Sequence, residues 1–450
     1  MSRKKRYLPL RCGRMLIGLS LIWSVDALAQ QVPAPPISIS LDEAIHRAQA
    51  NEPAFANAVA IQKTTQIDRY LAKAAFLPSV TYHNQMIYTQ PNGQTNQGGQ
   101  VGTQASPIFI ANNAIHEYMS QASINETVGL KQFADAQIAS ANAARATAEM
   151  EVARRGLVSA VVSLYYAVSA ANSRQRLQAE ALKEAQAFTD LTQKREAQRE
   201  VARADVVKSQ LQQQQKQRDL SDAVVAANRA RLELAVLLFP DPRTSYSTVE
   251  PNAPTSLPTR EEVNQQAAAN NPEIRSALAD LRAGKAAVAS AKAAYFPDLA
   301  LNFTYGIDAP QFAKQGPDNV RNLGYSISGT LDIPVWDWFS TQKRVKQSEI
   351  LRDVAKVNLT AAQRRLIATL EESYAEAAVA RDQLDLLDQS VRTAAESLRL
   401  TKLRYGAGES TALEVVDAQN AFLGAAIALT DGFVRYQSAL STLQLLTGIL

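Results

Sequence analysis

Four short segments of the chain alternate between apolar and polar residues, the pattern of a β-strand with one apolar face. In the third segment, apolar residues from Leu299 to Tyr305 alternate with small or polar residues from Ala300 to Gly306. Each segment has the length that a tilted strand needs to cross a bilayer. The pattern predicts four transmembrane strands, or else an ordinary soluble pair of hairpins. The segments span residues 80–90, 120–130, 299–307 and 325–333.

The sequence repeats itself. Residues 42–53 resemble residues 261–272, and the same offset aligns residues 72–78 with residues 291–297 without a gap. After a shorter loop in the second half, Tyr165 aligns with Tyr374. We therefore predict a duplication in which each half contains a helix, a strand, a loop, a strand, a long helix and a shorter helix. The first helices begin at Leu41 and Arg260 and end at Pro78 and Pro297, because proline blocks continuation of a helix.

The long helices are expected over residues 134–194 and 339–403, and the shorter ones over 202–239 and 412–446. A helix of about 60 residues is about 90 Å long, more than a globular domain needs. Residues 156–173 carry no charge and approach the length of a membrane span. Their repeat counterpart contains three glutamates, which do not sit in lipid, so water-exposed coiled packing is predicted. These are Glu371, Glu372 and Glu376.

The N-terminus has the pattern of a secretory signal. An apolar stretch follows a basic region and ends at the small residues Ala27 and Ala29. Removing the signal takes away six cations and Asp26, which leaves 41 basic and 42 acidic residues and a net charge of −1. This balance argues against nucleic acid as a partner. The predicted units are the signal peptide at 1–29, the first repeat at 30–240, an equatorial linker at 241–259 and the second repeat at 260–450.

Enzymatic motifs are missing from the sequence. Cys12 is the only cysteine and lies in the signal, and the three histidines have no metal-ligand spacing. No phosphate-binding loop or nucleophile motif occurs. We therefore expect no enzyme, no cofactor and no metal site.

Four strands cannot close a barrel in lipid. An open sheet edge leaves backbone groups unpaired there, and single-chain barrels begin at about eight strands. Several chains must then contribute to one barrel. Trp336, Trp338 and Phe339 follow the last strand, where an interfacial aromatic belt would lie. Core packing at the junction of sheet and helix is the alternative.

In its repeats and junctions, the chain resembles the TolC-like outer-membrane efflux proteins. The resemblance covers the whole mature chain and rests on the order and spacing of several loose motifs. These lie at residues 41–44, 51–53, 72–78, 291–297, 331–336 and 404–418.

This resemblance implies a mainly α fold with a small transmembrane β part. Three chains would form a twelve-stranded barrel in outer-membrane lipid, continuous with a twelve-helix periplasmic tunnel. The homotrimer would be the passive exit duct of a tripartite efflux or type I secretion system. Its partners would be a periplasmic adaptor and an inner-membrane transporter.

The tip of the second helical hairpin carries the candidate gate. Gly406 and Gly408 permit a tight turn between its helices. Glu414 and Asp417 share one helix face, and the resemblance implies that this acidic pair lines the closed periplasmic entrance. Three copies would form a ring of six carboxylates that attracts cations. Solvated surface acids are the alternative.

Other residues at the tips complete the prediction. Tyr405 occupies the place of a gate tyrosine in the family, but Ser410 stands where an arginine partner is expected. Asp205 matches Glu414 by repeat and is a weaker gate candidate. The first tip is expected to face outward, to pack against the adaptor or simply to be solvated. It carries Arg195, Arg199, Arg203 and Lys208.

Two other classes of protein remain as alternatives. A periplasmic coiled-coil scaffold or adaptor would have similar helices and a small sheet but no pore. A trimeric surface adhesin would place one barrel segment at the C-terminus, whereas here strand pairs occur in both halves and the chain ends in a predicted helix.

Overall fold

The computed structural model describes residues 37–88, 116–249, 256–316, 319 and 321–448. The predicted signal peptide therefore lies outside the described residues. The first half contains β1 (Ile37–Ile39), α1 (Leu41–Asn51), α2 (Pro53–Ala74), β2 (Ser79–Tyr88), β3 (His116–Val128), α3 (Leu130–Ala197) and α4 (Arg203–Leu238). The second half contains β4 (Tyr246–Thr248), α5 (Arg260–Asn270), α6 (Pro272–Ala293), β5 (Asp298–Ala309), β6 (Leu323–Asp332), α7 (Ser340–Gly406) and α8 (Ala412–Thr447).

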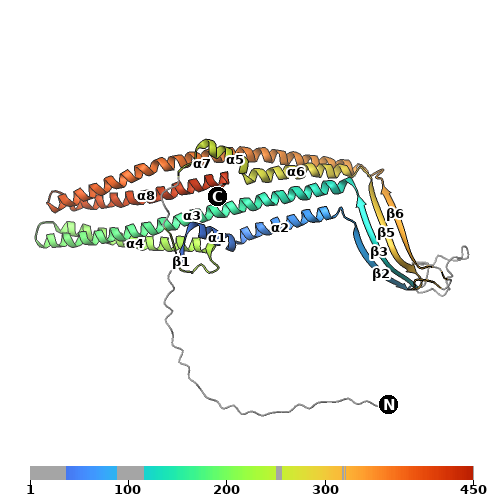
Figure 1. The fold of residues 1–450 in the computed structure, drawn as a ribbon. Coiled ribbons are helices and arrows are strands. Elements are labelled where there is room, and N and C mark those ends of the chain that lie inside the picture. The colour runs from blue at the N-terminus through green and yellow to red at the C-terminus, as the bar shows by residue number, and fades with distance from the viewer. Residues whose placement is uncertain (1–36, 89–115, 250–255, 317–318, 320, 449–450) are drawn as a thin grey trace, which may run out of the picture.

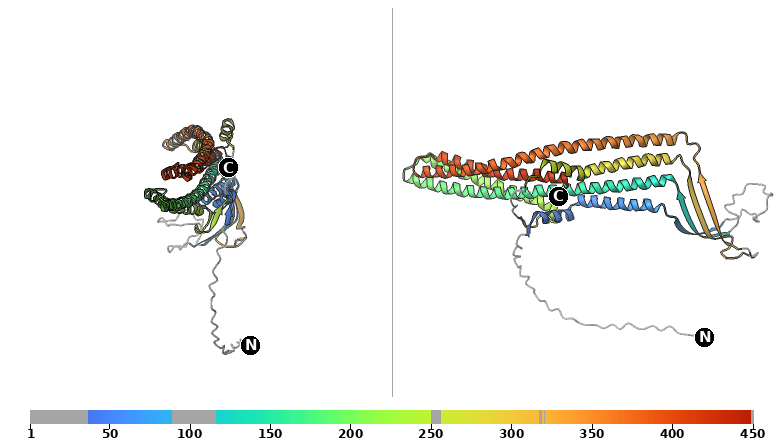
Figure 2. Two further views of the ribbon diagram at one scale, coloured as in Figure 1. Left: turned by 90° about the vertical axis from the view of Figure 1, so that its left-hand side faces the viewer. Right: turned by 45° about the horizontal axis from the view of Figure 1, so that its top comes forward.

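The molecule is a long rod of helices with a sheet at one end and two helical tips at the other (Figure 1). The α3–α4 tip and the α7–α8 tip lie side by side in Figure 1 and in the right-hand view of Figure 2. Corresponding helices of the two halves have nearly equal lengths. They contain 11 and 11, 22 and 22, 68 and 67, and 36 and 36 residues.

The helix that was predicted to begin at Leu41 and end at Pro78 is two helices, and so is its counterpart. Glu52 and Asn271 are extended, and Pro53 and Pro272 each begin a new helix. The cause is local, because proline disfavours the helical conformation in the residue before it. The Asn271 side chain accepts a hydrogen bond from the Ile274 amide and so caps the new helix.

The four long strands form one antiparallel sheet in the order β2-β3-β5-β6. β3 begins and ends earlier than the strand predicted at 120–130, because Leu130 already opens α3. β3 also pairs with β5, which joins the two halves of the chain. Among the described residues, β2 and β6 have a partner strand on one side only, so both outer edges of the sheet are open there.

The sheet has one polar and one apolar face. Across β3, β5 and β6, register rows of polar residues alternate with rows of apolar ones. One polar row is Ser123, Thr304 and Ser326, and the next apolar row is Ile124, Phe303 and Ile327. Asn84 interrupts the apolar face of β2, where it accepts a hydrogen bond from the Ser120 hydroxyl at 2.7 Å.

A second, smaller sheet was not predicted. β1 and β4 pair in parallel beside the middle of the rod, so the segment predicted as a linker contains a strand. Its core packs Ile39 and Tyr246 against α3 and α4. The Tyr165 hydroxyl donates to the Ile39 and Val249 carbonyl oxygens at 3.0 and 2.8 Å. Strands of three residues are too short to produce a period-two pattern in the sequence.

Within the described part of the chain, two helices, α3 and α8, are long and apolar enough to cross a membrane by length and composition. Part of that apolar surface packs inside the chain. Val161 of α3 is completely buried, and Leu443 of α8 is 1% exposed. The apolar stretches therefore have an internal packing role in this fold.

Candidate gate at the hairpin tips

The second tip turns at Gly408. Its φ of 79° lies in the left-handed region that favours glycine, and its amide donates to the Tyr405 carbonyl at 3.1 Å. Gly406 instead ends α7, and a Cβ built there meets nothing within 4 Å. Of the two glycines predicted to shape this turn, only Gly408 has a backbone that requires glycine.

Glu414 caps its own helix. Its side chain accepts hydrogen bonds from the Ser410 hydroxyl at 2.9 Å and the Thr411 hydroxyl at 3.1 Å. The Thr411 hydroxyl in turn accepts from the Glu414 amide, and the Thr411 amide donates to the Glu414 carboxylate, which completes a capping box. The hydrogen bond from Ser410, then those from Thr411, lower the pKa of Glu414, and the charge of Arg404 adds to the effect. Ser410 thus partners Glu414 at the position where an arginine was expected.

Asp417 lies one turn further along α8 and is exposed, as Glu414 is. Between them, Val415 and Val416 are buried against Phe188 and Tyr405. The two valines therefore lie on the side of α8 that packs against the chain's own core, and the two acids lie on the side that faces away from it. Both carboxylates are therefore available on one surface of the tip.

Tyr405 is 4% exposed and packs its ring against Phe188, with centroids 5.2 Å apart. Its hydroxyl is buried and has no hydrogen-bond partner among the described residues. Asp205, the weaker candidate, lies in the first turn of α4, where a carboxylate is favoured by the helix dipole. No hydrogen bond or ion pair joins Asp205 to Tyr405 or Glu414 in the described part of the chain.

Arg195 was expected to face outward or to pack against a partner, but it contacts the second tip. Its guanidinium donates to the carbonyl oxygens of Tyr405 at 2.6 Å and Gly406 at 3.1 Å. The same group lies over the Tyr405 ring at 5.1 Å and pairs with Glu200 at 3.0 Å. The sequence shows that the first tip is basic, but it does not show which of the basic residues contacts the second hairpin.

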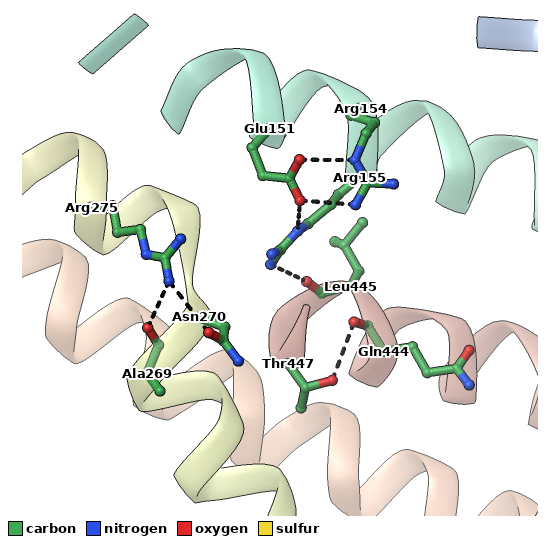
Figure 3. Close-up of polar contacts among 9 residues, drawn as sticks. All are labelled: Glu151, Arg154, Arg155, Ala269, Asn270, Arg275, Gln444, Leu445 and Thr447. Carbon is green, nitrogen blue, oxygen red and sulfur yellow. Dashed lines mark hydrogen bonds and ion pairs between the residues drawn. The ribbon is translucent and has the colours of Figure 1, made fainter. Parts of the chain in front are cut away.

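At the other end of α8, a second arginine of α3 makes a similar contact (Figure 3). Arg155 donates to the Leu445 carbonyl at 3.1 Å and pairs with Glu151 at 2.7 Å. Hydrogen bonds from Arg154 and then Arg155 lower the pKa of Glu151 to about 2, against the opposing effect of burial. A Cβ on Gly448 would lie 2.5 Å from the Arg155 guanidinium, so the helix end fits closely over this side chain.

The three aromatic residues after β6 form one exposed cluster. Trp336 lies 5.8 Å from Trp338 and 5.3 Å from Phe339 between ring centroids. Trp338 and Phe339 have φ values of 56° and 61°, and Asp337 accepts a hydrogen bond from the Thr341 amide at 2.7 Å. Because Trp338 is 82% exposed, the cluster does not form a core within the chain.

Residues 263–449 match the family model of outer membrane efflux proteins. The outer membrane protein OprJ of Pseudomonas aeruginosa is 30% identical over 173 residues, which cover 38% of this chain and 35% of that protein. The pyoverdine export outer membrane protein OpmQ of the same species is 26% identical and covers 86% of this chain and 80% of its own length. The outer membrane protein VceC of Vibrio cholerae has the same fold, with a TM-score of 0.76, 18% identity and coverage of 91% and 96%.

The fold is that of outer-membrane channel proteins, and the relatives in sequence are outer-membrane proteins. More particularly, the second half of the chain matches the outer membrane efflux protein family, the chain is similar to TolC-like outer-membrane proteins, and its location is the outer membrane. The resemblance drawn from the sequence is thereby confirmed.

Proposed function

We propose that three copies of this chain close one twelve-stranded barrel in the outer membrane. The observation that carries the proposal is the sheet with two open edges and an exposed apolar face. Tyr325 and Ile327 on that face are 73% and 72% exposed. In lipid, apolar side chains can stay exposed, but unpaired backbone groups at an edge cannot. Joining β6 of each chain to β2 of the next satisfies both requirements.

The barrel continues into a periplasmic tunnel of twelve helices. Large apolar side chains remain exposed along the helices of the single chain and would be covered by neighbouring chains. Val357 of α7 and Val225 of α4, for example, are 67% and 68% exposed. The matched lengths and order of elements in the two halves support an internal duplication. Because of this duplication, each chain contributes two similar groups of helices, and three chains together form a tunnel with nearly sixfold symmetry.

The assembled protein is a passive duct rather than an enzyme. It receives cargo from an inner-membrane transporter through a periplasmic adaptor and releases it outside the cell. OpmQ is named for pyoverdine export, which supports a small-molecule cargo, and a polypeptide cargo is the other class the family suggests. Trp336, Trp338 and Phe339 anchor the barrel at the periplasmic surface of the membrane, where amphipathic rings are favoured.

The periplasmic entrance closes at the tips. Glu414 and Asp417 of three chains form a ring of six carboxylates that attracts cations, while Tyr405 holds the tip together beneath it. Asp205 contributes negative charge from the first tip. The exposure of both acids and their common face on α8 support this arrangement.

The test is membrane extraction followed by conductance. Outer membranes are washed with high salt, and the protein is then solubilised in detergent, cross-linked and inserted into planar lipid bilayers. A duct stays in the membrane through the salt wash, migrates as a trimer and conducts weakly at rest. A non-pore scaffold is released by salt and produces no conductance, and that result would reject the proposal.

A further inference from the structure

We propose that the periplasmic base of the barrel binds the headgroups of anionic phospholipids through Lys73, Lys292 and Lys343. This inference rests on the membrane barrel proposed above and assigns a lipid class to the leaflet that faces the periplasm. Each lysine lies about one turn from a large exposed apolar residue at a junction between a helix and a strand. These apolar residues are Leu77, Phe296 and Phe339.

Two of the three sites are copies of each other. The motif at residues 72–78 recurs at residues 291–297, so Lys73 corresponds to Lys292 and Leu77 corresponds to Phe296. In both copies the lysine lies in the last turn of its helix, and the apolar residue follows before the strand. Leu77 is 68% exposed and Phe296 is 54% exposed. The four-residue spacing places the charge about 6 Å further from the sheet than the apolar side chain.

The third site has the same spacing in the opposite chain direction, because α7 leaves the sheet. Phe339 precedes α7 and is 59% exposed, and Lys343 follows four residues later. At all three sites the apolar residue therefore lies on the side of the sheet and the cation on the side of the rod. This order matches the surface of a bilayer, where rings lie at the level of the headgroups and long basic side chains extend towards the polar phase.

The three lysines are free to bind an anion. All of them are exposed, and none forms an ion pair among the described residues. Lys131, at the same end of the rod, differs because it pairs with Asp135 at 2.8 Å. Asp298 and Asp332 face each other in register on the polar face of the sheet, away from the proposed lipid surface. The positive charge of the three lysines is therefore not neutralised by a neighbouring acid.

Assembly of the trimer should leave these sites open. α6 already packs against α3 on one side and α7 on the other (Figure 1). Gly284 of α6 lies so close to α7 that a Cβ would come within 3.2 Å of the Arg352 Cα. Lys292 stays exposed between these two neighbours. By the repeat, α2 would receive α7 of the next chain as its second neighbour, so Lys73 should stay exposed in the same way.

The apolar surface beside the lysines favours a phospholipid over a soluble anion. Ile327 and Leu331 of β6 are 72% and 57% exposed, and they extend the apolar face of the sheet down to the junction. A free phosphate ion could contact an ammonium group but would leave this apolar surface in water. A phospholipid covers the apolar surface with its acyl chains and brings its phosphate to the level of the lysines.

The test uses the tryptophan fluorescence of the purified trimer. Once the predicted signal is removed, Trp336 and Trp338 are the only tryptophans of the chain. Their emission reports the Lys343 site and, across the proposed β6–β2 junction, Lys73 of the next chain. The trimer is reconstituted with brominated phosphatidylglycerol, which is anionic, or brominated phosphatidylcholine, which is zwitterionic, each diluted into the other unlabelled lipid. Bromine quenches a neighbouring tryptophan, so the two series give the relative affinity of the lipids at this surface.

The natural protein should favour the anionic lipid about fivefold for each lysine within reach, and concentrated salt should weaken this preference. Lys343→Gln and Lys73→Gln should each lower the preference by about that factor. Lys356→Gln is the matched control and should leave it unchanged. Lys356 is an exposed lysine of the same helix, about 20 Å further from the sheet, which exceeds the screening length in physiological salt.

The Lys292 site is tested by moving the probe. Trp336→Phe and Trp338→Phe remove the natural signal, and Phe296→Trp places a tryptophan beside Lys292. In this background the anionic lipid should again be preferred, and Lys292→Gln should remove the preference. Trimer content on gels is measured for every variant. If a variant fails to assemble, the effect of salt on the natural protein decides, and a preference that salt leaves unchanged would reject the site.

Equal quenching by the two lipids in the natural trimer would overturn the headgroup site and leave the membrane barrel in place. An equal fall in Lys356→Gln would overturn it too, because charge would then act without regard to position. If inorganic phosphate removed the preference more strongly than chloride at equal ionic strength, a soluble anion would be the ligand and the proposal would be wrong. If neither lipid quenches the tryptophans, the junction does not lie at a membrane and the proposed function itself has failed.

Discussion

The Ser410 hydroxyl lies 2.9 Å from the Glu414 carboxylate and donates a hydrogen bond to it. This bond joins the turn of the second tip to the first turn of α8. It means that the acid proposed for the entrance has a partner in its own chain, and that its charge is stabilised before any other chain approaches.

Removing both acids of the tip should open the entrance. In the proposed trimer, Glu414 and Asp417 would attract cations into the narrow opening, and the bound cations would hold the ring together. Changing both residues to Ala should raise single-channel conductance and weaken the block by divalent cations. An unchanged current would reject the gate assignment and leave the duct in place.

Cation selectivity should persist into mildly acidic solution. The pKa of Glu414 is lowered, so its carboxylate stays charged below the pH at which an ordinary glutamate takes up a proton. The favourable contribution of the charged form is present above the ordinary pKa and is lost as the pH falls through the lowered pKa. Ser410→Ala should move this loss to higher pH. Reversal potentials measured across a salt gradient from pH 7 to pH 3.5 test the shift, and identical profiles for both proteins would contradict it.

Glu151→Gln should destabilise the protein at neutral pH but not in strong acid. The pKa of Glu151 is about 2 in the folded chain against 4.5 for the ordinary group. Its ion pairs therefore contribute fully above pH 4.5, and the contribution is lost as the pH falls towards 2. Because Glu151 is partly exposed, we expect a cost of about 1–2 kcal/mol at pH 7. Melting in detergent at pH 7, 3 and 2 should show the natural protein approaching the variant, and a constant difference would reject this assignment.

Gly306→Ala should disrupt the sheet, whereas Gly324→Ala should not. The two glycines face each other in register between β5 and β6. A Cβ on Gly306 would lie 2.2 Å from the Ser120 carbonyl oxygen and 2.5 Å from the Gln121 Cα, both of which are backbone atoms of β3. A Cβ on Gly324 meets nothing within 4 Å. Trimer content of outer membranes is the measurement, and equal yields of the two variants would show that β3 and β5 tolerate a wider spacing.

The strands and helices were predictable from the sequence where periodicity extends over many residues. The long helices begin and end within a few residues of the predicted bounds, since their patterns extend over many turns. The break before Pro53 was missed because apolar residues resume directly after it, at Ala54 and Phe55, and the preference of the residue before a proline was given too little weight. The β1–β4 pair contains too few residues to show a pattern.

The candidate site was predictable only in part. The acids at Glu414 and Asp417 are visible from their spacing, and the turn from its glycines. The roles of Ser410 and Arg195 were missed for a physical reason. Ser410 was missed because a carboxylate such as that of Glu414 accepts hydrogen bonds from whichever donor lies nearest in space. Arg195 was missed because its contact with the second tip depends on the packing of whole hairpins and not on any local sequence pattern.

The open edges of β2 and β6 have a consequence for biogenesis. A solitary chain that enters the bilayer carries two rows of unsatisfied amide and carbonyl groups, so it gains little by staying there. Insertion should therefore be a collective event whose rate rises steeply with protein concentration. Complete assemblies would then remain in the bilayer, while incomplete ones would return to the aqueous phase.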